Sequence, residues 1–380
     1  MRDPVGPIVM RNRAHNVLTS YTLIYYYNNK TIRPMSMITA TAAVHEEDLS
    51  KMSLEEFCGD IRRRESQGLD GIALFNEVIS RGYAPDLIAE DEVQHSRRLE
   101  HITTEITRRF HQEALRIVLV AGPSCSGKTT TSRFLNHMLR DNGIQPCVVS
   151  LDNYFLNLDQ RPLDPSGNID YESFYGLDLK QLSRDVASLL AGDQVSMPTY
   201  DYVKGERTYR GNTLKLESNS LLFLEGLHAL NPLLIPEIED EMKFRLFVTA
   251  QATIYYGEKT GLEEHDNRLL RRIYRDYNSR GASALQTLQW WPGVLRGENL
   301  WILPFASHAD AWFNTSMVFE FSAIKSRVSM LLREVPESEP VEYEIAKRLS
   351  AVLDRIAPLS KEDFDRIAPK RRFLLSNEGK

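Results

Sequence analysis

The sequence predicts an α/β fold in which a mostly parallel sheet is covered by helices on both faces. Short all-apolar segments alternate with amphipathic helical segments, which is the pattern of a parallel sheet buried on both sides. One apolar segment leads into a glycine-rich loop, and that loop leads into a helix. Further helices are expected before and after this α/β part.

The strands and helices of the α/β part can be placed by residue number. The strand candidates are 117–121, 146–151, 220–224, 244–249 and 312–315. The helical runs between them are 127–141, 177–190 and 266–278. The polar, turn-rich segment 197–216 predicts an inserted hairpin.

Four segments are expected along the chain. A basic, tyrosine-rich segment of unassigned fold covers 1–58, and a helical lead-in covers 59–114. The α/β domain is expected at 115–335, and a C-terminal tail with helices at 340–357 and 361–367 covers 336–380. Within the first segment, 21–38 favours two strands about a turn over an organelle-targeting peptide.

Composition excludes several classes of protein. The formal net charge of −6 argues against nucleic acid as a partner. No stretch approaches the about 18 apolar residues of a membrane span. Three cysteines suit a reducing compartment, so we expect a cytoplasmic protein. The oligomeric state stays open, with a homo-oligomer as one alternative.

The loop after the first strand matches the phosphate-binding pattern G-x-x-x-x-G-K-[ST] without a mismatch. Its glycines permit a tight turn whose N–H groups point at phosphate oxygens, and Lys128 adds a positive charge. The Thr129 hydroxyl is a hard oxygen ligand for Mg²⁺. The predicted phosphate-binding residues are Gly122, Pro123, Ser124, Cys125, Ser126, Gly127, Lys128, Thr129 and Thr130. This P-loop NTPase pattern predicts a bound nucleoside triphosphate.

Two acids follow predicted strands. In an open parallel sheet the carboxyl ends of the strands face the ligand, so Asp152 is expected beside the transferred phosphoryl group. A carboxylate there can accept a proton from an attacking hydroxyl. Glu225 ends another apolar strand, where an acid holds Mg²⁺ directly or through water.

The helix at 266–278 carries four arginines on one stripe. Arg268, Arg271, Arg272 and Arg275 fall within an arc of about 100°. Guanidinium groups this close repel one another unless water, carboxylates or an anion compensates their charge. Next to a triphosphate site, we interpret them as an arginine lid that closes on phosphate and excludes water.

Taken together, segments 122–129, 150–155, 222–226 and 268–281 resemble the uridine kinase and phosphoribulokinase family. The resemblance runs from about 115 to 335. Residues 59–380 are similar to the branch whose kinase domain follows a threonyl-tRNA-synthetase-like region, a region largely missing here.

The resemblance implies a role for individual residues. Asp152 matches the base that deprotonates a nucleoside 5′-hydroxyl, and Asp170 matches the carboxylate that binds ribose. Tyr200 matches the aromatic ring that packs on the base. The further implied contacts are Tyr154, Arg268 and Gln286 to the substrate, and Arg271 and Arg275 to phosphate, with Lys128 and Arg271 supporting catalysis. Where pyrimidine nucleoside kinases have a base-reading histidine, this chain has Gly205.

We therefore expect a kinase that uses ATP and Mg²⁺ to phosphorylate a small molecule, with a pyrimidine nucleoside such as uridine or cytidine as the first candidate. The chain has no N-K-x-D guanine reader, although the donor base stays open. One alternative is a phosphoribulokinase-like kinase of sugars or other metabolites. Another is an ATP-binding regulatory or RNA-interacting protein without turnover, which only the basic N-terminus favours.

Overall fold

The computed structural model describes residues 71–202, 204–250 and 265–366, all within the compact unit Ser50–Lys380. The expectations for the basic N-terminal segment and its hairpin lie outside the described residues. None of the described helices is long and apolar enough to cross a membrane.

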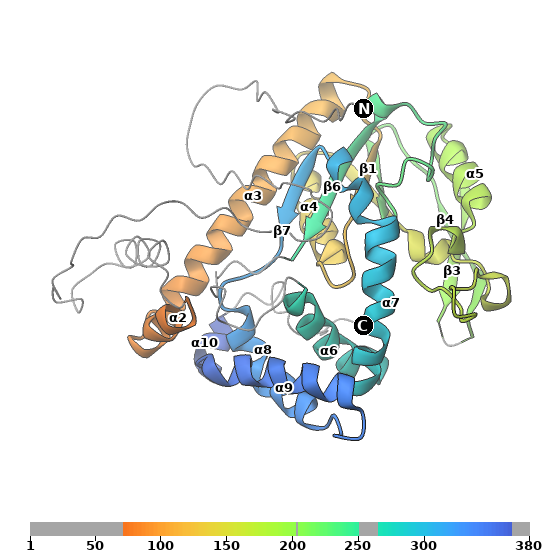
Figure 1. Ribbon diagram of the computed structural model, residues 1–380. Helices are drawn as coiled ribbons and strands as arrows, with labels where there is room; N and C mark the ends of the chain where they lie inside the picture. The colour runs from red at the N-terminus through yellow and green to blue at the C-terminus, as the bar shows by residue number, and fades with distance from the viewer. Residues whose placement is uncertain (1–70, 203, 251–264, 367–380) are drawn as a thin grey trace, which may run out of the picture. The chain divides into compact units, whose positions relative to one another are not determined.

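A five-stranded parallel sheet forms the centre of this unit, with the strand order β2-β5-β1-β6-β7 (Figure 1). The strands are β1 (Ile117–Ala121), β2 (Gln145–Ser150), β5 (Ser220–Glu225), β6 (Lys243–Thr249) and β7 (Ala311–Asn314). All five lie where the sequence predicts them. Their parallel pairing confirms the predicted fold class.

Each face of the sheet has its own apolar core because successive strand side chains point to opposite faces. Val118 and Val120 of β1 pack with α3 (Ala84–Gln112) and α4 (Lys128–Asp141). Ile117 and Leu119 belong to the opposite core, with α5 (Leu179–Leu190). The predicted two-sided burial is therefore correct.

The predicted hairpin is also present. Strand β3 (Val195–Asp201) pairs antiparallel with β4 (Glu206–Leu214) as a separate two-stranded sheet. Val195 and Tyr200 anchor it in the core beneath α5. Figure 1 shows the hairpin and α5 on the opposite side of the sheet from α3.

A third core is built mainly from helices and includes the start of α3. It joins α2 (Gly71–Ser80), α6 (Asp266–Arg280), α7 (Ala284–Trp301), α8 (Glu320–Arg333) and α9 (Pro340–Arg355), with the short α10 (Lys361–Arg366) beside it. Figure 1 shows α6, α8 and α9 gathered at one end of the sheet. The sequence analysis did not predict α7 or α8. Helix α7 contains Pro292 next to Gly293, and this pair of residues is typical of a loop rather than a helix.

His228 is a polar residue enclosed in the core just after β5. It is 2% exposed, and its ring meets that of Phe174 edge-on at 5.7 Å. Burial lowers the pKa of His228 to about 4, although the Trp301 main chain opposes the shift. The folded protein therefore holds this imidazole neutral.

This burial predicts a loss of stability in mild acid. Below the ordinary pKa of 6.5, His228 binds a proton in the unfolded chain. In the folded chain, His228 binds this proton only when the pH falls to about 4. From pH 7.5 to pH 5, His228 should therefore lower the free energy of unfolding by about 2 kcal/mol. Urea denaturation at both pH values measures the change. His228→Phe should reduce this pH dependence, and His137→Gln, at an exposed position on α4, should not. Equal slopes for all three proteins would contradict the prediction.

Candidate active site

The phosphate loop joins β1 to α4, and two glycines shape it. At Gly122, φ is +153°, and a Cβ atom would lie 1.9 Å from the Val248 carbonyl oxygen. At Gly127, φ is +89°, immediately before α4 begins at Lys128. A side chain at either position would strain the backbone. The loop therefore presents its N–H groups and the positive end of the α4 dipole at one point.

The Lys128 side chain folds back over this loop. Its Nζ donates to the carbonyl oxygens of Gly122 (2.9 Å) and Pro123 (3.1 Å). Burial lowers the pKa of Lys128, while the negative charges of Glu225 and Asp152 oppose the shift. The predicted phosphate-binding ammonium therefore shares one electrostatic environment with both predicted acids.

The side chains of Glu225 and Thr129 lie next to each other. The Thr129 hydroxyl lies 3.3 Å from Glu225 Oε2. Burial raises the pKa of Glu225, and the charge of Lys128 counteracts this. A hydroxyl and a carboxylate are hard oxygen donors, and Mg²⁺ keeps water and phosphate oxygens in its remaining positions. These two side chains therefore fit the predicted metal.

Asp152 follows β2 in the short 3₁₀ helix η2 (Leu151–Tyr154). The Ser150 hydroxyl accepts a hydrogen bond from the Asp152 N–H (3.3 Å) and fixes the start of that helix. Asp152 Oδ2 accepts from the Tyr202 hydroxyl at 2.8 Å. Asp152 forms no ion pair with another described residue, and its charge influences the pKa values of Lys128 and Glu225.

The arginine stripe of α6 lies against the phosphate loop. Arg268 donates to the Ser124 carbonyl (3.3 Å), and Arg271 donates to the Cys125 carbonyl (3.3 Å). Arg272 donates to the Ser124 hydroxyl (2.8 Å). The helix sequence thus brings its cations to the place expected of a lid.

Buried carboxylates compensate these cations. Arg268 pairs with Glu298 of α7 at 2.6 Å, and Arg271 pairs with Glu320 of α8, with Nη2 to Oε2 at 2.8 Å. Asp276, which is fully buried, lies 3.2 Å from Arg272 and 2.7 Å from Arg275. Such pairs are expensive to break because a lone buried charge would remain. We therefore revise the prediction of a freely closing lid, because these ion pairs hold Arg268 and Arg271 in place against the phosphate loop.

The residues predicted to bind the acceptor come from the hairpin and from the segment after η2. Tyr200 is 6% exposed and contacts the rings of Phe155 and Tyr202. Its N–H donates to Asn153 Oδ1 (3.2 Å), next to Asp152 in the chain. Asp170 accepts the Glu172 N–H (3.2 Å) and lies 3.7 Å from Arg296.

Two predicted substrate contacts have other roles in the structure. Tyr154 is 1% exposed, and its hydroxyl donates to Asp185 at 2.9 Å. The structure therefore gives this side chain a place in the core, with its hydroxyl already paired. Gln286 is exposed and caps α7 by accepting the Ser283 N–H (3.0 Å). Among the described residues, the side chain of Gln286 bonds only within this cap.

The sequence analysis missed several residues here. Glu298 and Glu320 are the carboxylates that four clustered arginines require, so the stripe itself was a signal for them. Glu172 lies two residues after Asp170, and burial raises its pKa against the pull of Arg272 and Lys128. A Cβ atom on Gly297 would lie 2.2 Å from Glu172 Cβ, so this glycine makes room for the acid.

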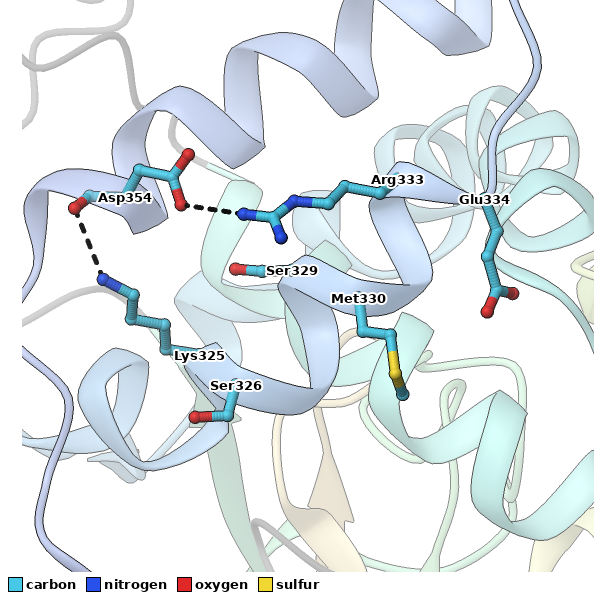
Figure 2. A pocket seen from close by; sticks show the side chains of 7 residues that line it. All are labelled: Lys325, Ser326, Ser329, Met330, Arg333, Glu334 and Asp354. Atoms are coloured by element: carbon cyan, nitrogen blue, oxygen red, sulfur yellow. Dashed lines mark hydrogen bonds and ion pairs between the residues drawn. The ribbon is translucent and has the colours of Figure 1, made fainter.

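A cavity of about 340 Å³ lies elsewhere, between α8 and α9. Figure 2 shows the Lys325 and Arg333 side chains reaching toward Asp354 there. Its lining is Lys325, Ser326, Ser329, Met330, Arg333, Glu334 and Asp354. None of these residues belongs to the candidate active site.

Uridine kinases are among the known proteins to which this chain is similar. The uridine kinase of Deinococcus deserti is 28% identical over 195 residues, which are 51% of this chain and 84% of that protein. The uridine kinase of Pectobacterium carotovorum is 29% identical over 197 residues, again 51% of this chain and 84% of the other.

Solved structures also align with the chain. A possible uridine kinase from Bacillus stearothermophilus aligns with a TM-score of 0.39 and 18% identity, covering 58% of this chain and 98% of that one. A D-glycerate 3-kinase from Cryptococcus neoformans aligns with a TM-score of 0.35 and 14% identity, covering 53% and 87%. The model of the phosphoribulokinase/uridine kinase family matches residues 117–319, more than half of the 380 residues, and the chain therefore belongs to that family of kinases.

Proposed function

We propose that this chain transfers the γ-phosphoryl group of ATP to a hydroxyl group of a small molecule, with the 5′-hydroxyl of a pyrimidine nucleoside as the first candidate. One observation carries the proposal. The phosphate loop, the Thr129–Glu225 pair and Asp152 come together at the carboxyl ends of β1, β5 and β2, which are neighbours in the sheet.

Each group then has a chemical task. The loop N–H groups and Lys128 bind the β- and γ-phosphates, and the α6 arginines add positive charge at the loop. Thr129 and Glu225 would hold Mg²⁺, which neutralises developing charge on the phosphate oxygens. Asp152 accepts the acceptor's hydroxyl proton as the new O–P bond forms. Most of the catalysis is therefore positioning and charge compensation.

A neutral acceptor with several hydroxyl groups suits the carboxylates on its side of the site. We propose that Asp170 binds ribose hydroxyls and that Tyr200 packs on the base. Gly205 cannot supply the base-reading side chain of the pyrimidine nucleoside kinases. Its φ is +68°, and a Cβ atom would lie 2.1 Å from Leu158 Cδ1. Recognition of the base therefore falls to other residues.

Arg161 supports a second candidate, an acceptor that carries a phosphate or carboxylate. Its guanidinium group stacks over Phe155 (4.3 Å) and Tyr200 (5.1 Å) while the residue is only 8% exposed. Its Nε donates to the Leu156 carbonyl, and in the described part of the chain it has no ion pair. A sugar phosphate needs such a second cation, apart from the arginines of α6.

The setting of the reaction is also a proposal. The described Cys125 and Cys147 are free thiols, which supports a reducing compartment such as the cytoplasm. The likeness of 59–380 to the branch with a threonyl-tRNA-synthetase-like region stays a prediction.

An acceptor panel distinguishes the two candidates. Nucleosides and sugar phosphates are incubated with ATP, Mg²⁺ and the full chain, and the phosphorylated products are detected by mass. We expect nucleoside monophosphates. If only the sugar phosphates are phosphorylated, the second candidate, an acceptor whose phosphate binds Arg161, would be favoured. ATP binding without product from either class would contradict the kinase proposal and favour a regulatory binding protein.

Removing the base should slow the chemical step while leaving ATP binding intact. Asp152→Asn keeps the shape of the side chain but lowers its basicity, so kcat should fall by about 10²–10⁴-fold. Calorimetric titration should give an unchanged Kd for ATP. Asp159→Asn, at an exposed position in the same segment, is the control and should retain full kcat. Full turnover by Asp152→Asn would show that another group accepts the proton.

Neutralising the metal carboxylate should weaken Mg²⁺ binding. Glu225→Gln keeps one oxygen but removes the charge, so the Mg²⁺ concentration for half-maximal activity should rise about 10-fold or more. Activity is measured over a Mg²⁺ titration at fixed ATP. Glu217→Gln alters an exposed acid before the same strand and should change nothing. An unchanged Mg²⁺ requirement in Glu225→Gln would refute this assignment.

A further inference from the structure

Tyr202 directly follows β3 in the hairpin, and its ring and its hydroxyl group make different contacts. The residue is 64% exposed, and its ring meets that of Tyr200 edge-on at 5.2 Å. Its hydroxyl, however, donates to Asp152 Oδ2 at 2.8 Å. The hairpin therefore contributes a hydrogen-bond donor to the proposed catalytic base, 50 residues away in the chain.

The two carboxylate oxygens of Asp152 are not equivalent as a result. Oδ2 is occupied by the phenol, whereas Oδ1 accepts no hydrogen bond from any described residue. An exposed carboxylate with no partner can rotate about its side-chain torsions, and rotation would carry the basic oxygen away from its target. A hydrogen bond to one oxygen fixes the plane of the group and leaves the other oxygen directed.

Hydrogen bonds also hold the hairpin that carries the phenol of Tyr202. The hairpin is tied to the segment after Asp152 by three hydrogen bonds. They run from Tyr200 N–H to Asn153 Oδ1 (3.2 Å), from Arg207 N–H to Asn157 Oδ1 (3.0 Å) and from Leu158 N–H to the Gly205 carbonyl (3.0 Å). Tyr202 and Asp152 therefore belong to one braced unit.

The phenol remains a donor under physiological conditions. Desolvation raises the pKa of Tyr202, and the charge of Asp152 and the hydrogen bond to it raise the pKa further. Tyr202 therefore keeps its proton while a neighbouring base changes its protonation state.

We propose that Tyr202 is a positioning residue that holds Asp152 Oδ2 and thereby directs Oδ1 at the acceptor hydroxyl. This inference rests on the proposed function. In the step, the acceptor oxygen forms its bond to the γ-phosphorus, and the bond from that phosphorus to the β,γ-bridging oxygen breaks. The acceptor proton passes to Asp152 Oδ1, ADP leaves with the bridging oxygen, and Tyr202 exchanges no proton.

The test is a double-mutant cycle on kcat with ATP, Mg²⁺ and the acceptor found in the panel. Tyr202→Phe removes only the hydroxyl, and its kcat should fall about 10-fold, because a hydrogen bond to a charged group is lost. In an Asp152→Asn background, the same change should give no further loss, because the base that it orients is already gone. Tyr209→Phe, at an exposed tyrosine on β4, is the matched control and should leave kcat unchanged.

Several outcomes would overturn the inference. Equal losses in both backgrounds would mean that the hydroxyl acts independently of Asp152. A higher kcat in Tyr202→Phe would mean that the phenol blocks the base, and a change in the acceptor KM alone would mean that it only binds substrate. We expect the ATP affinity and the Tm of Tyr202→Phe to be unchanged. A lower value of either would reveal a folding defect, and such a defect would lower kcat in both backgrounds. If the wild-type chain phosphorylates an acceptor and Asp152→Asn does not, the proposed function stands whatever Tyr202→Phe shows.

Discussion

The site depends on a buried negative charge at the end of the second strand from one edge of the sheet. Glu225 pairs in register with Ser150 of β2 on one side and with Val120 of β1 on the other. The residues that follow those partners lead to Asp152 and to the phosphate loop. Parallel register alone therefore brings the proposed base and the phosphate loop to Glu225. Lys128 compensates the two acids, and this mutual compensation allows all three charges to coexist in a largely buried site.

A second set of charges fixes the helical part of the molecule to the loop. The arginines of α6 need carboxylates, and these come from α7 and α8, so three helices meet at the loop through Arg268–Glu298 and Arg271–Glu320. Thr315, just beyond β7, adds a bridge by donating to the Ser126 carbonyl at 2.6 Å. Contacts from α6 and Thr315 thus hold the phosphate loop in addition to the turns at its own glycines. This favours a site that is preorganised before the substrate binds.

The parts that the sequence could predict are those that depend on local pattern. Five apolar strands and the glycine-rich loop carry their signals within a few residues, and the structure places them as expected. Helix α7 was missed because Pro292 breaks the helical pattern, and the bond of Tyr154 to Asp185 joins residues that are 31 positions apart in the chain. The bond between Tyr202 and Asp152 depends on how the hairpin folds over η2, and no local pattern records it.

The central claim is that one carboxylate receives the acceptor's proton beside a triphosphate held by the loop. A crystal structure with Mg²⁺, a non-hydrolysable ATP analogue and the acceptor tests it most directly. The account predicts that the acceptor hydroxyl lies about 3 Å from Asp152 Oδ1 and in line with the γ-phosphorus, with the metal beside Thr129 and Glu225. A hydroxyl bound well beyond hydrogen-bond distance from Asp152, with another side chain at its proton, would contradict it.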